Sequence, residues 1–220
     1  MSQSTSPACV HIVDDDESLR LALDSLFRSV GLQTRLYPSA QDFLDAKLVD
    51  GPSCLVSDGR LPGMSGLEMQ SHLLGTGLKM PIVLMTGHGD IPMTVKAMKA
   101  GAVDFLTKPF RDQEMLDAVS AALDGDRQRR DLRQKSAAIV NEFNSLTPRE
   151  RQVLALVTAG KMNKQVAAEL GLSEITVKIH RGHVMKKMGV RSLADLVRKA
   201  EILDAGVAGK LESGATKTSV

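Results

Sequence analysis

The sequence predicts an α/β domain with a five-stranded, doubly wound parallel sheet, followed by a smaller all-α domain. Over residues 9–124, apolar runs of about four residues alternate with longer segments of helical period, and from residue 145 only helical segments follow. Residues 9–124 hold 10 Lys and Arg against 16 Asp and Glu, whereas residues 145–204 hold 11 against 6. An acidic module that could hold a cation is thus joined to a basic module that could hold a polyanion, although uneven surface charge on one domain could give the same imbalance.

Five strands are expected in the first domain, residues 9–124. Their apolar runs are continuous rather than alternating, which is typical of parallel strands covered on both faces. The runs are residues 10–13, 54–56, 82–85 and 103–106, with 34–37 as a weaker one. Strict alternation with helices implies a doubly wound α/β domain. The flavodoxin-like strand order 2-1-3-4-5 is the one expected for it, and under that order the ligand site lies between the first and third strands.

Five helices are expected between and after these strands. Gly31 and Gly101 are helix stops, and Ser39 is a helix start before an apolar pair. The expected helices cover residues 17–30, a segment beginning after Ser39, and residues 66–74, 91–100 and 111–123.

Charged and polar side chains follow the predicted strands. Asp14 and Asp15 follow the first strand, Asp58 the third, Thr86 the fourth and Lys108 the fifth. Charges at the ends of apolar strands cost desolvation unless they share a ligand, and the carboxyl ends of parallel strands meet at one edge. Carboxylate oxygens without His or thiolate favour Mg²⁺ or Mn²⁺ over zinc and leave positions for phosphoryl oxygens. The sequence therefore predicts a divalent metal site that also receives a phosphoryl group.

Asp58 is the candidate nucleophile of this site. A carboxylate that attacks a phosphoryl group forms an aspartyl-phosphate, and the metal and Lys108 would offset the anionic repulsion. The Thr86 hydroxyl could donate a hydrogen bond to a phosphoryl oxygen and so report that the site is occupied. Taken singly, each residue could be a turn, cap or solvated side chain; together at one edge they favour the site. Pro109 fixes the backbone after Lys108, and a cis bond there would aim the lysine inward.

Four segments of the first domain resemble the receiver domain of bacterial two-component response regulators. They are His-Ile-Val-Asp-Asp-Asp (11–16), Val-Ser-Asp-Gly-Arg-Leu-Pro-Gly-Met-Ser-Gly-Leu-Glu (56–68), Met-Thr-Gly-His-Gly-Asp (85–90) and Ala-Met-Lys-Ala-Gly-Ala-Val-Asp-Phe-Leu-Thr-Lys-Pro-Phe (97–110). The resemblance implies that a sensor histidine kinase phosphorylates Asp58. It also implies magnesium bound by Asp15, Asp58 and the Arg60 carbonyl with Asp14 acting through water, and a switch pair formed by Thr86 and Phe105.

Gly59 departs from the receiver pattern, because an apolar residue more often follows the phosphoacceptor. Glycine is expected to loosen the loop beside the site, which leaves the lifetime of the phosphorylated state open. This departure keeps one alternative in view, a phosphorylation-independent DNA-binding regulator with a structural receiver. A second alternative is a magnesium phosphohydrolase that uses Asp58 as nucleophile and carries an accessory DNA module.

Residues 125–145 are expected to form a charged, mostly helical linker. They lack proline, and their apolar residues Leu132, Ile139, Val140 and Phe143 lie too sparsely to form a core stripe. A helical linker transmits a rotation better than a Gly-Ser tether; a calmodulin-like or nucleic-acid target is the alternative interpretation. The ends of the chain, residues 1–8 and 205–220, are expected to be a disordered and a flexible tail.

Residues 146–204 are expected to form four helices that include a helix-turn-helix. Thr147 and Glu150 form a capping box around Pro148, and Val153, Leu154 and Val157 then face inward. Residues 164–170 and 174–188 form helices on either side of a tight turn at 171–173. A second capping box at 192–195 opens the fourth helix.

The helix at 174–188 has two different faces. Val177, Val184 and Met188 share an inward stripe with His180 at its edge, whereas Ile175, Lys178, Ile179 and Gly182 share an outward one. In a DNA major groove, Ile179 could meet a thymine methyl and Lys178 guanine acceptors, with Gly182 permitting close approach. A dimer contact or an incidental surface residue is the alternative interpretation of Ile179. Arg181, Lys186 and Lys187 are expected to meet phosphates rather than bases. The candidate DNA-contacting residues are Asn163, Lys164, Thr176, Lys178, Ile179, Arg181, Gly182, Lys186 and Lys187.

Three segments of the second domain resemble the LuxR-type DNA-binding domain. They are Leu-Thr-Pro-Arg-Glu-Arg-Gln-Val-Leu (146–154), Asn-Lys-Gln-Val-Ala-Ala-Glu-Leu (163–170) and Ser-Glu-Ile-Thr-Val-Lys-Ile-His-Arg (173–181). Joined to a receiver, they make the chain similar to NarL/FixJ-family transcription regulators, closest to the FixJ branch. The resemblance implies promoter DNA and RNA polymerase as partners and a homodimer on phosphorylation. It implies no enzymatic activity beyond weak self-dephosphorylation.

Composition and motifs also exclude some classes of protein. Cys9 and Cys54 lie beside apolar strand runs without metal-ligand spacing, so both are expected to be reduced thiols of a cytoplasmic protein. No window approaches 18 uninterrupted apolar residues, and residues 1–7 lack the pattern of a signal peptide. Membrane spanning and export are therefore not expected.

Overall fold

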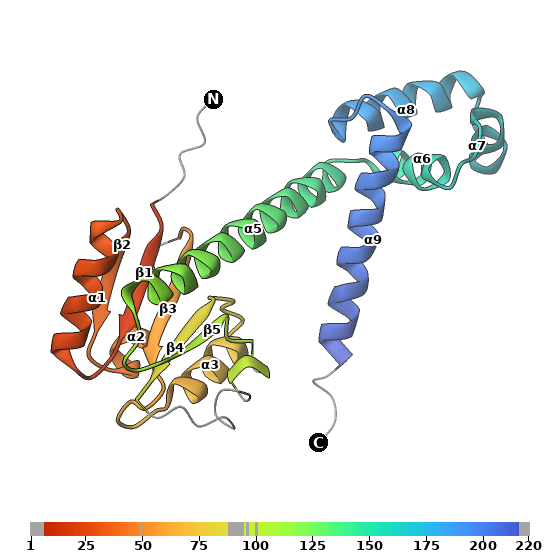
Figure 1. Ribbon diagram of the computed structural model, residues 1–220. Helices are drawn as coiled ribbons and strands as arrows, with labels where there is room; N and C mark the ends of the chain where they lie inside the picture. Colours follow the sequence, from red (N-terminus) through yellow and green to blue (C-terminus); the bar gives the residue numbers. More distant parts are fainter. Residues whose placement is uncertain (1–6, 49, 88–94, 96, 100, 216–220) are drawn as a thin grey trace. The chain divides into compact units, whose positions relative to one another are not determined.

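The computed structural model describes residues 7–48, 50–87, 95, 97–99 and 101–215, with side chains described as far as residue 204. The chain divides into two compact units, Met1–Arg130 and Asp131–Val220. Figure 1 shows a sheet flanked by helices in the first unit and only helices in the second. Within the described residues, no helix is both long and apolar enough to cross a membrane.

The first unit is built on a five-stranded, all-parallel sheet. Its strands are β1 (Cys9–Val13), β2 (Gln33–Tyr37), β3 (Ser53–Asp58), β4 (Ile82–Thr86) and β5 (Asp104–Thr107). They lie in the order β2-β1-β3-β4-β5, so the predicted fold class and strand order are confirmed. Because β1 pairs with both β2 and β3, the carboxyl ends of β1 and β3 are neighbours at one edge of the sheet.

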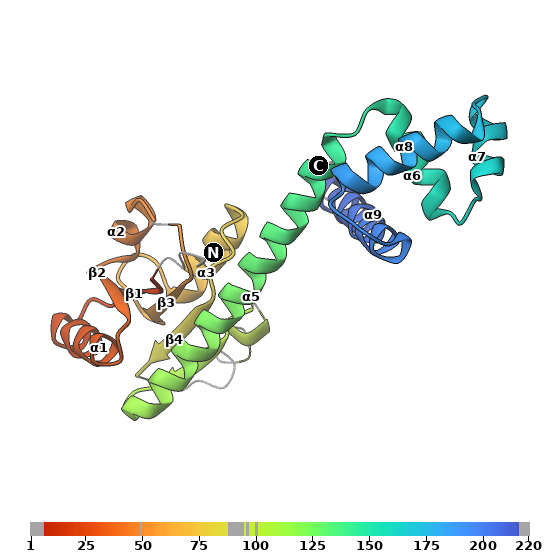
Figure 2. The same cartoon turned by 90° about the horizontal axis from the view of Figure 1, so that it is seen from above.

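Helices cover both faces of this sheet. On one face, α1 (Glu17–Ser29) and the first part of α5 (Asp112–Asn144) pack against β1, β3 and β4. On the other face lie α2 (Ala40–Asp45) and α3 (Gly66–Gly75), as Figure 2 shows. The helix expected at 91–100 falls largely outside the described residues, of which 95 and 97–99 are helical.

Helix α5 differs from the prediction, because it does not end at residue 123 but runs through the expected linker to Asn144. Met115, Val119 and Leu123 belong to the core of the first unit. Ile139 is buried in the core of the second unit and Phe143 packs against that core, so the expectation that these residues are too sparse to contribute was wrong. A spacing of four places both on one side of the helix, and two side chains are enough to complete so small a core.

The second unit contains α6 (Pro148–Thr158), α7 (Asn163–Leu170), α8 (Glu174–Lys187) and α9 (Leu193–Ala215). The capping box of Thr147 and Glu150 opens α6, and Gly171 ends α7 in the left-handed conformation at φ 65°. The helix-turn-helix is thus confirmed. Helix α9 extends to Ala215, beyond the expected start of the flexible tail at residue 205; residues 216–220 lie outside the described part of the chain.

Candidate metal centre and nucleic-acid interface

The structure brings three carboxylates together at the carboxyl edge of the sheet. Asp14 and Asp15 follow β1, Asp58 is the last residue of β3, and oxygen atoms of the three lie within 4.8 Å of one another. Asp14 is buried, Asp58 is half-buried and Asp15 is exposed. The strand order places them together, since β1 and β3 are adjacent in the sheet.

Lys108 completes this cluster from the segment after β5. Its Nζ donates to Asp14 Oδ2 at 2.8 Å and to Asp58 Oδ2 at 3.1 Å. Burial alone would lower the pKa of Lys108, but the two carboxylates outweigh it and raise the pKa above its ordinary value. The lysine is therefore charged at neutral pH. Its backbone N–H donates to the Thr86 carbonyl at 2.6 Å, and the Lys108–Pro109 bond is cis.

The donor set fits a hard divalent cation. One ammonium offsets only part of the charge of three clustered carboxylates, and oxygen ligands of this kind suit Mg²⁺ or Mn²⁺. The backbone of Arg60 lies beside Asp58, since its N–H donates to Asp58 Oδ1 at 3.3 Å. Asp14 is held from a second side because its Oδ1 accepts from the Asp16 N–H at 2.9 Å.

The two residues expected to form a switch pair lie on neighbouring strands. Thr86 is the last residue of β4 and is fully buried. Phe105 lies in β5, paired in register with Leu84, and packs partly buried against the core on the α2 and α3 face. The backbone carbonyl of Thr86 accepts from the backbone N–H of Lys108, and Phe105 lies in β5, the strand that leads to Lys108.

Two glycines shape the backbone behind Asp58. The Gly59 N–H donates to the Met85 carbonyl at 2.6 Å, and the Gly59 carbonyl accepts from Gly66 at 3.2 Å, so this loop is held on both sides. Gly66 was not singled out from the sequence. A Cβ at this position would lie 2.7 Å from the Asp58 carbonyl oxygen and 2.7 Å from Leu84 Cδ2, so α3 can begin this close to Asp58 only with glycine.

Gly66→Ala is therefore expected to lower the free energy of unfolding of the first unit by roughly 1–3 kcal/mol, because a methyl group cannot fit without a backbone shift. Urea unfolding of the full chain, followed by circular dichroism, measures this change. Gly75→Ala in the same helix is the control, since its Cβ would meet open space and helix propensity would favour alanine. Equal stability of the two variants would contradict the close approach.

The outward face of α8 is exposed as the sequence predicted. Ile175 and Ile179 are 73% and 53% exposed, and Lys178 and Gly182 are exposed beside them. A Cβ at Gly182 would meet nothing within 4 Å, so this part of the helix presents bare backbone. The inward residues Val177, Val184 and Met188 are buried in the core of the second unit.

The basic candidates around α8 fall into two groups. Lys164 and Lys186 are exposed, and Arg181 is held by Asn163, whose Oδ1 accepts from its guanidinium at 3.2 Å. Lys187 is engaged within the protein, donating to the buried Glu150 at 2.7 Å and to the Ser145 carbonyl at 3.3 Å. The hydroxyl of Thr176 lies 2.8 Å from that of Ser173, the N-cap of α8. Lys187 is thus the candidate least available to a phosphate.

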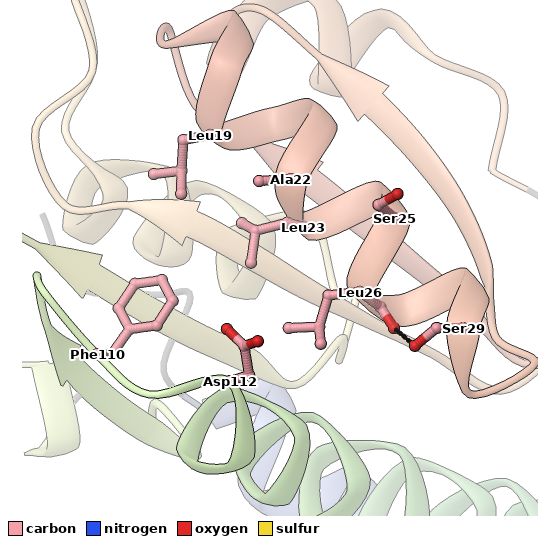
Figure 3. A pocket seen from close by; sticks show the side chains of 8 residues that line it. All are labelled: Leu19, Ala22, Leu23, Ser25, Leu26, Ser29, Phe110 and Asp112. Atoms are coloured by element: carbon pink, nitrogen blue, oxygen red, sulfur yellow. Dashed lines mark hydrogen bonds between the residues drawn. The ribbon is translucent and has the colours of Figure 1, made fainter.

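A separate shallow pocket lies between α1 and the start of α5. Figure 3 shows its lining, which is mostly apolar: Leu19, Ala22, Leu23, Ser25, Leu26, Ser29, Phe110 and Asp112. It includes none of the carboxylates that surround Lys108. This pocket is therefore not the metal and phosphoryl site predicted from the strand ends.

Comparison with known proteins identifies both units. The response regulator receiver domain model matches residues 10–120, and the model of the luxR family of bacterial regulatory proteins matches residues 144–200. The chain is 57% identical over 202 residues to nodulation protein W of Bradyrhizobium diazoefficiens, covering 92% of this chain and 89% of that protein. The chain belongs to the NarL/FixJ family of response regulators. The resemblance seen in the sequence is thereby confirmed.

Further relatives place this response regulator beside transcriptional regulators. It is 43% identical to the transcriptional regulatory protein FixJ of Azorhizobium caulinodans, over 90% of this chain and 93% of that protein. The solved structure of the response regulator StyR is 48% identical, has a TM-score of 0.83, and is matched over 89% of this chain and 99% of that one. The domain combination implies a kinase partner and DNA binding, and receivers typically use a divalent metal at their acidic cluster.

Proposed function

We propose that a sensor histidine kinase transfers a phosphoryl group to Asp58 and that this modification controls dimerisation and promoter binding of this response regulator. The observation that carries the proposal is the cluster of Asp14, Asp15 and Asp58, in which Asp14 and Asp58 pair with the Lys108 ammonium. In the transfer, an Asp58 oxygen bonds to phosphorus while the bond from phosphorus to the kinase histidine nitrogen breaks. Lys108 then bridges buried Asp14 and the new phosphoryl group.

Mg²⁺, or Mn²⁺ in its place, is the proposed cofactor. Asp14, Asp15, Asp58 and the Arg60 carbonyl would hold it, and it would supply positive charge to the phosphoryl oxygens. The chain's own contribution is to position Asp58 and to keep Lys108 charged. Catalysis beyond weak self-dephosphorylation is not part of the proposal, because the relatives are transcriptional regulators.

The proposed switch runs from Thr86 to the surface around β5. The Thr86 hydroxyl would donate a hydrogen bond to a phosphoryl oxygen and move inward, and the Phe105 side chain would follow this movement. The equilibrium between conformations would then shift toward the state that can dimerise. This surface already shows apolar side chains, since Val95, Met98 and Val103 are 44%, 46% and 37% exposed. We assign the surface of the expected helix at 91–100, strand β5 and the first part of α5 as the dimer contact.

The dimer would place two α8 helices on successive major grooves of promoter DNA. We place this activity in the cytoplasm, with RNA polymerase as a further partner. Ile179, Lys178 and Gly182 would face the bases, and their exposure supports this. Arg181 with Asn163, and Lys164, Thr176 and Lys186, would contact phosphates, whereas Lys187 would do so only while also paired with Glu150.

The experiment treats the full chain with beryllofluoride, a phosphoryl analogue, and Mg²⁺. We expect a monomer-to-dimer change by light scattering and promoter DNA bound roughly 10- to 100-fold more tightly, the usual scale of allosteric coupling. Excess EDTA should abolish both changes, because without the cation the three carboxylates repel the anionic beryllofluoride group. A chain that binds DNA equally in all conditions would instead be the phosphorylation-independent regulator.

Lys178→Ala is expected to weaken binding to the specific promoter site by ~1–3 kcal/mol, the usual value of one base contact. Binding to unrelated DNA should change far less, since phosphate contacts dominate there. Fluorescence anisotropy with the two DNAs measures the ratio, and Lys186→Ala, which removes an exposed cation later in α8, is the control. Equal losses on both DNAs for Lys178→Ala would refute its assignment to the bases.

A further inference from the structure

Asp126 is a buried carboxylate in the segment that the sequence predicted to be a charged, mostly helical linker. Only 1% of the residue is exposed, although it lies in an arginine-rich stretch of α5. Its Oδ2 accepts from the Ser53 backbone N–H at 3.0 Å and from Arg130 Nε at 2.8 Å, and its Oδ1 accepts from Arg129. Arg130 also pairs with Asp50, so the second guanidinium edge is held as well.

These contacts keep Asp126 ionised. Burial alone would raise its pKa, but the hydrogen bonds from Ser53, Arg130 and Arg129 outweigh burial and hold the pKa below its ordinary value. Hydrogen bonds to a buried, charged acceptor are shorter and stronger than those between neutral groups. Asp126 therefore attaches α5 directly to the first residue of β3, and Arg130 attaches it to Asp50 in the loop before this strand.

The strand that Asp126 holds is the one that carries the phosphoacceptor. Ser53 is the first residue of β3 and Asp58 is its last. At the far end of the strand, Asp58 is bonded to Lys108 at 3.1 Å, and α5 begins shortly after this lysine at Asp112. β3 is thus tied at one end to the segment that leads into α5 and at the other end to α5 itself.

We propose that Asp126 is a positioning residue that fixes α5 to the amino end of β3, so that a displacement of the Lys108 segment turns the helix about this point. Phosphorylation of Asp58 would move Lys108, because the ammonium would follow the new charge. The core residues Met115, Val119 and Leu123 hold the first turns of α5, and Asp126 holds the next turn to β3. A change in this part of the helix is then passed to the residues that follow Asp126. This inference rests on the proposed phosphorylation of Asp58.

The test compares Asp126→Asn with Asp124→Asn in the full chain. Asp124→Asn removes the same charge from the same helix, but the Asp124 side chain is exposed and pairs only with Arg127 among the contacts described. Amide hydrogen exchange is followed for Ser53 and for residues 127–144, with and without beryllofluoride and Mg²⁺. Mass spectrometry of the bound fluoride complex checks that Asp58 is loaded equally in each variant.

For the wild type and Asp124→Asn, we expect exchange in residues 127–144 to change when Asp58 is loaded. For Asp126→Asn, we expect the Ser53 amide to exchange at least about tenfold faster and the response of residues 127–144 to be lost. An unchanged response despite faster exchange at Ser53 would show a merely structural role and overturn the proposal. A wild type whose Asp58 is loaded but whose residues 127–144 do not respond overturns this inference alone. A loaded wild type that neither dimerises nor binds DNA more tightly overturns the proposed function, so the two failures are distinguishable.

Arg130→Gln provides a second variant in case Asp126→Asn folds poorly. It leaves the bond from Ser53 to Asp126 in place but removes the guanidinium between Asp126 and Asp50. The response of residues 127–144 should then fall to an intermediate value. If residues 127–144 respond fully in this variant while the Ser53 amide stays protected from exchange, the hydrogen bond from Ser53 alone provides the attachment. If residues 127–144 respond fully although the Ser53 amide has lost its protection, the proposal is overturned.

Discussion

Asp58→Asn is expected to abolish stable phosphoryl attachment and, with it, the roughly 10- to 100-fold gain in promoter affinity that we expect from a coupling of about 1.4–2.8 kcal/mol. The amide nitrogen and oxygen of asparagine do not provide the carboxylate nucleophile, and the metal loses a charged ligand. The variant should nevertheless fold. Lys108 keeps its bond of 2.8 Å to Asp14, and removing one of three carboxylates within 4.8 Å of one another reduces their repulsion.

The measurements for Asp58→Asn are phosphorylation by acetyl phosphate, read by mass spectrometry, and promoter binding by anisotropy. The free energy of unfolding without metal should be unchanged or higher, which separates lost chemistry from lost folding. Asp45→Asn, at the end of α2, is a matched control that should behave as the wild type. A variant at position 58 that dimerises and binds DNA as tightly as the treated wild type would rule out the switch.

The cluster at the sheet edge could be predicted because its geometry follows from a regular fold. Apolar runs and helical segments predict a doubly wound sheet, and the common flavodoxin-like strand order brings Asp14 next to Asp58 although they are far apart in sequence. The helix-turn-helix was predictable for a similar reason, since Ser173 and Gly171 are local signals for the start of α8 and the end of α7. Local pattern and regular topology together were sufficient for these parts.

Contacts between side chains distant in sequence could not be predicted in the same way. Nothing in the spacing of Asp126 reveals that it reaches Ser53, and its arginine neighbours alone indicate a solvated helix. Gly66 has the same limitation, since its role depends on how closely the carbonyl of Asp58 approaches the start of α3. The capping box of Glu150 was visible in the sequence, but its second partner on α8 was not.

Glu150→Ala is expected to have the largest effect on the stability of the DNA-binding unit. Glu150 is 3% exposed and accepts from the Thr147 N–H at 2.8 Å and from Lys187 Nζ at 2.7 Å, so it joins the start of α6 to the end of α8. Removing it leaves the Thr147 N–H without its acceptor and the exposed Lys187 ammonium without its carboxylate partner, and should cost roughly 1–3 kcal/mol. Loss of protection in α6 and α8, measured by hydrogen exchange in the full chain, reports this directly.

The acid dependence of this contribution follows from the carboxyl group. The hydrogen bonds from Lys187 and Thr147 lower the pKa of Glu150 from its ordinary value of 4.5 to about 2. A folded-state pKa below the unfolded one stabilises the unit fully above pH 4.5 and progressively less as the pH falls toward 2. The stability gap between the wild type and Glu150→Ala should therefore narrow over this range.

The control is Glu169→Ala, which removes a carboxylate paired with Lys161 in the same unit. Both side chains of that pair are more than a third exposed, so solvent screens it and the expected loss is below about 1 kcal/mol. Lys187→Met should recover part of the stability of Glu150→Ala, because the unpaired ammonium is then absent. Equal losses of stability for Glu150→Ala and Glu169→Ala at pH 7 would show that the Glu150–Lys187 bridge between α6 and α8 contributes no more than a surface pair. The placement of α8 would then come from the apolar core around Val177 and Val184 alone.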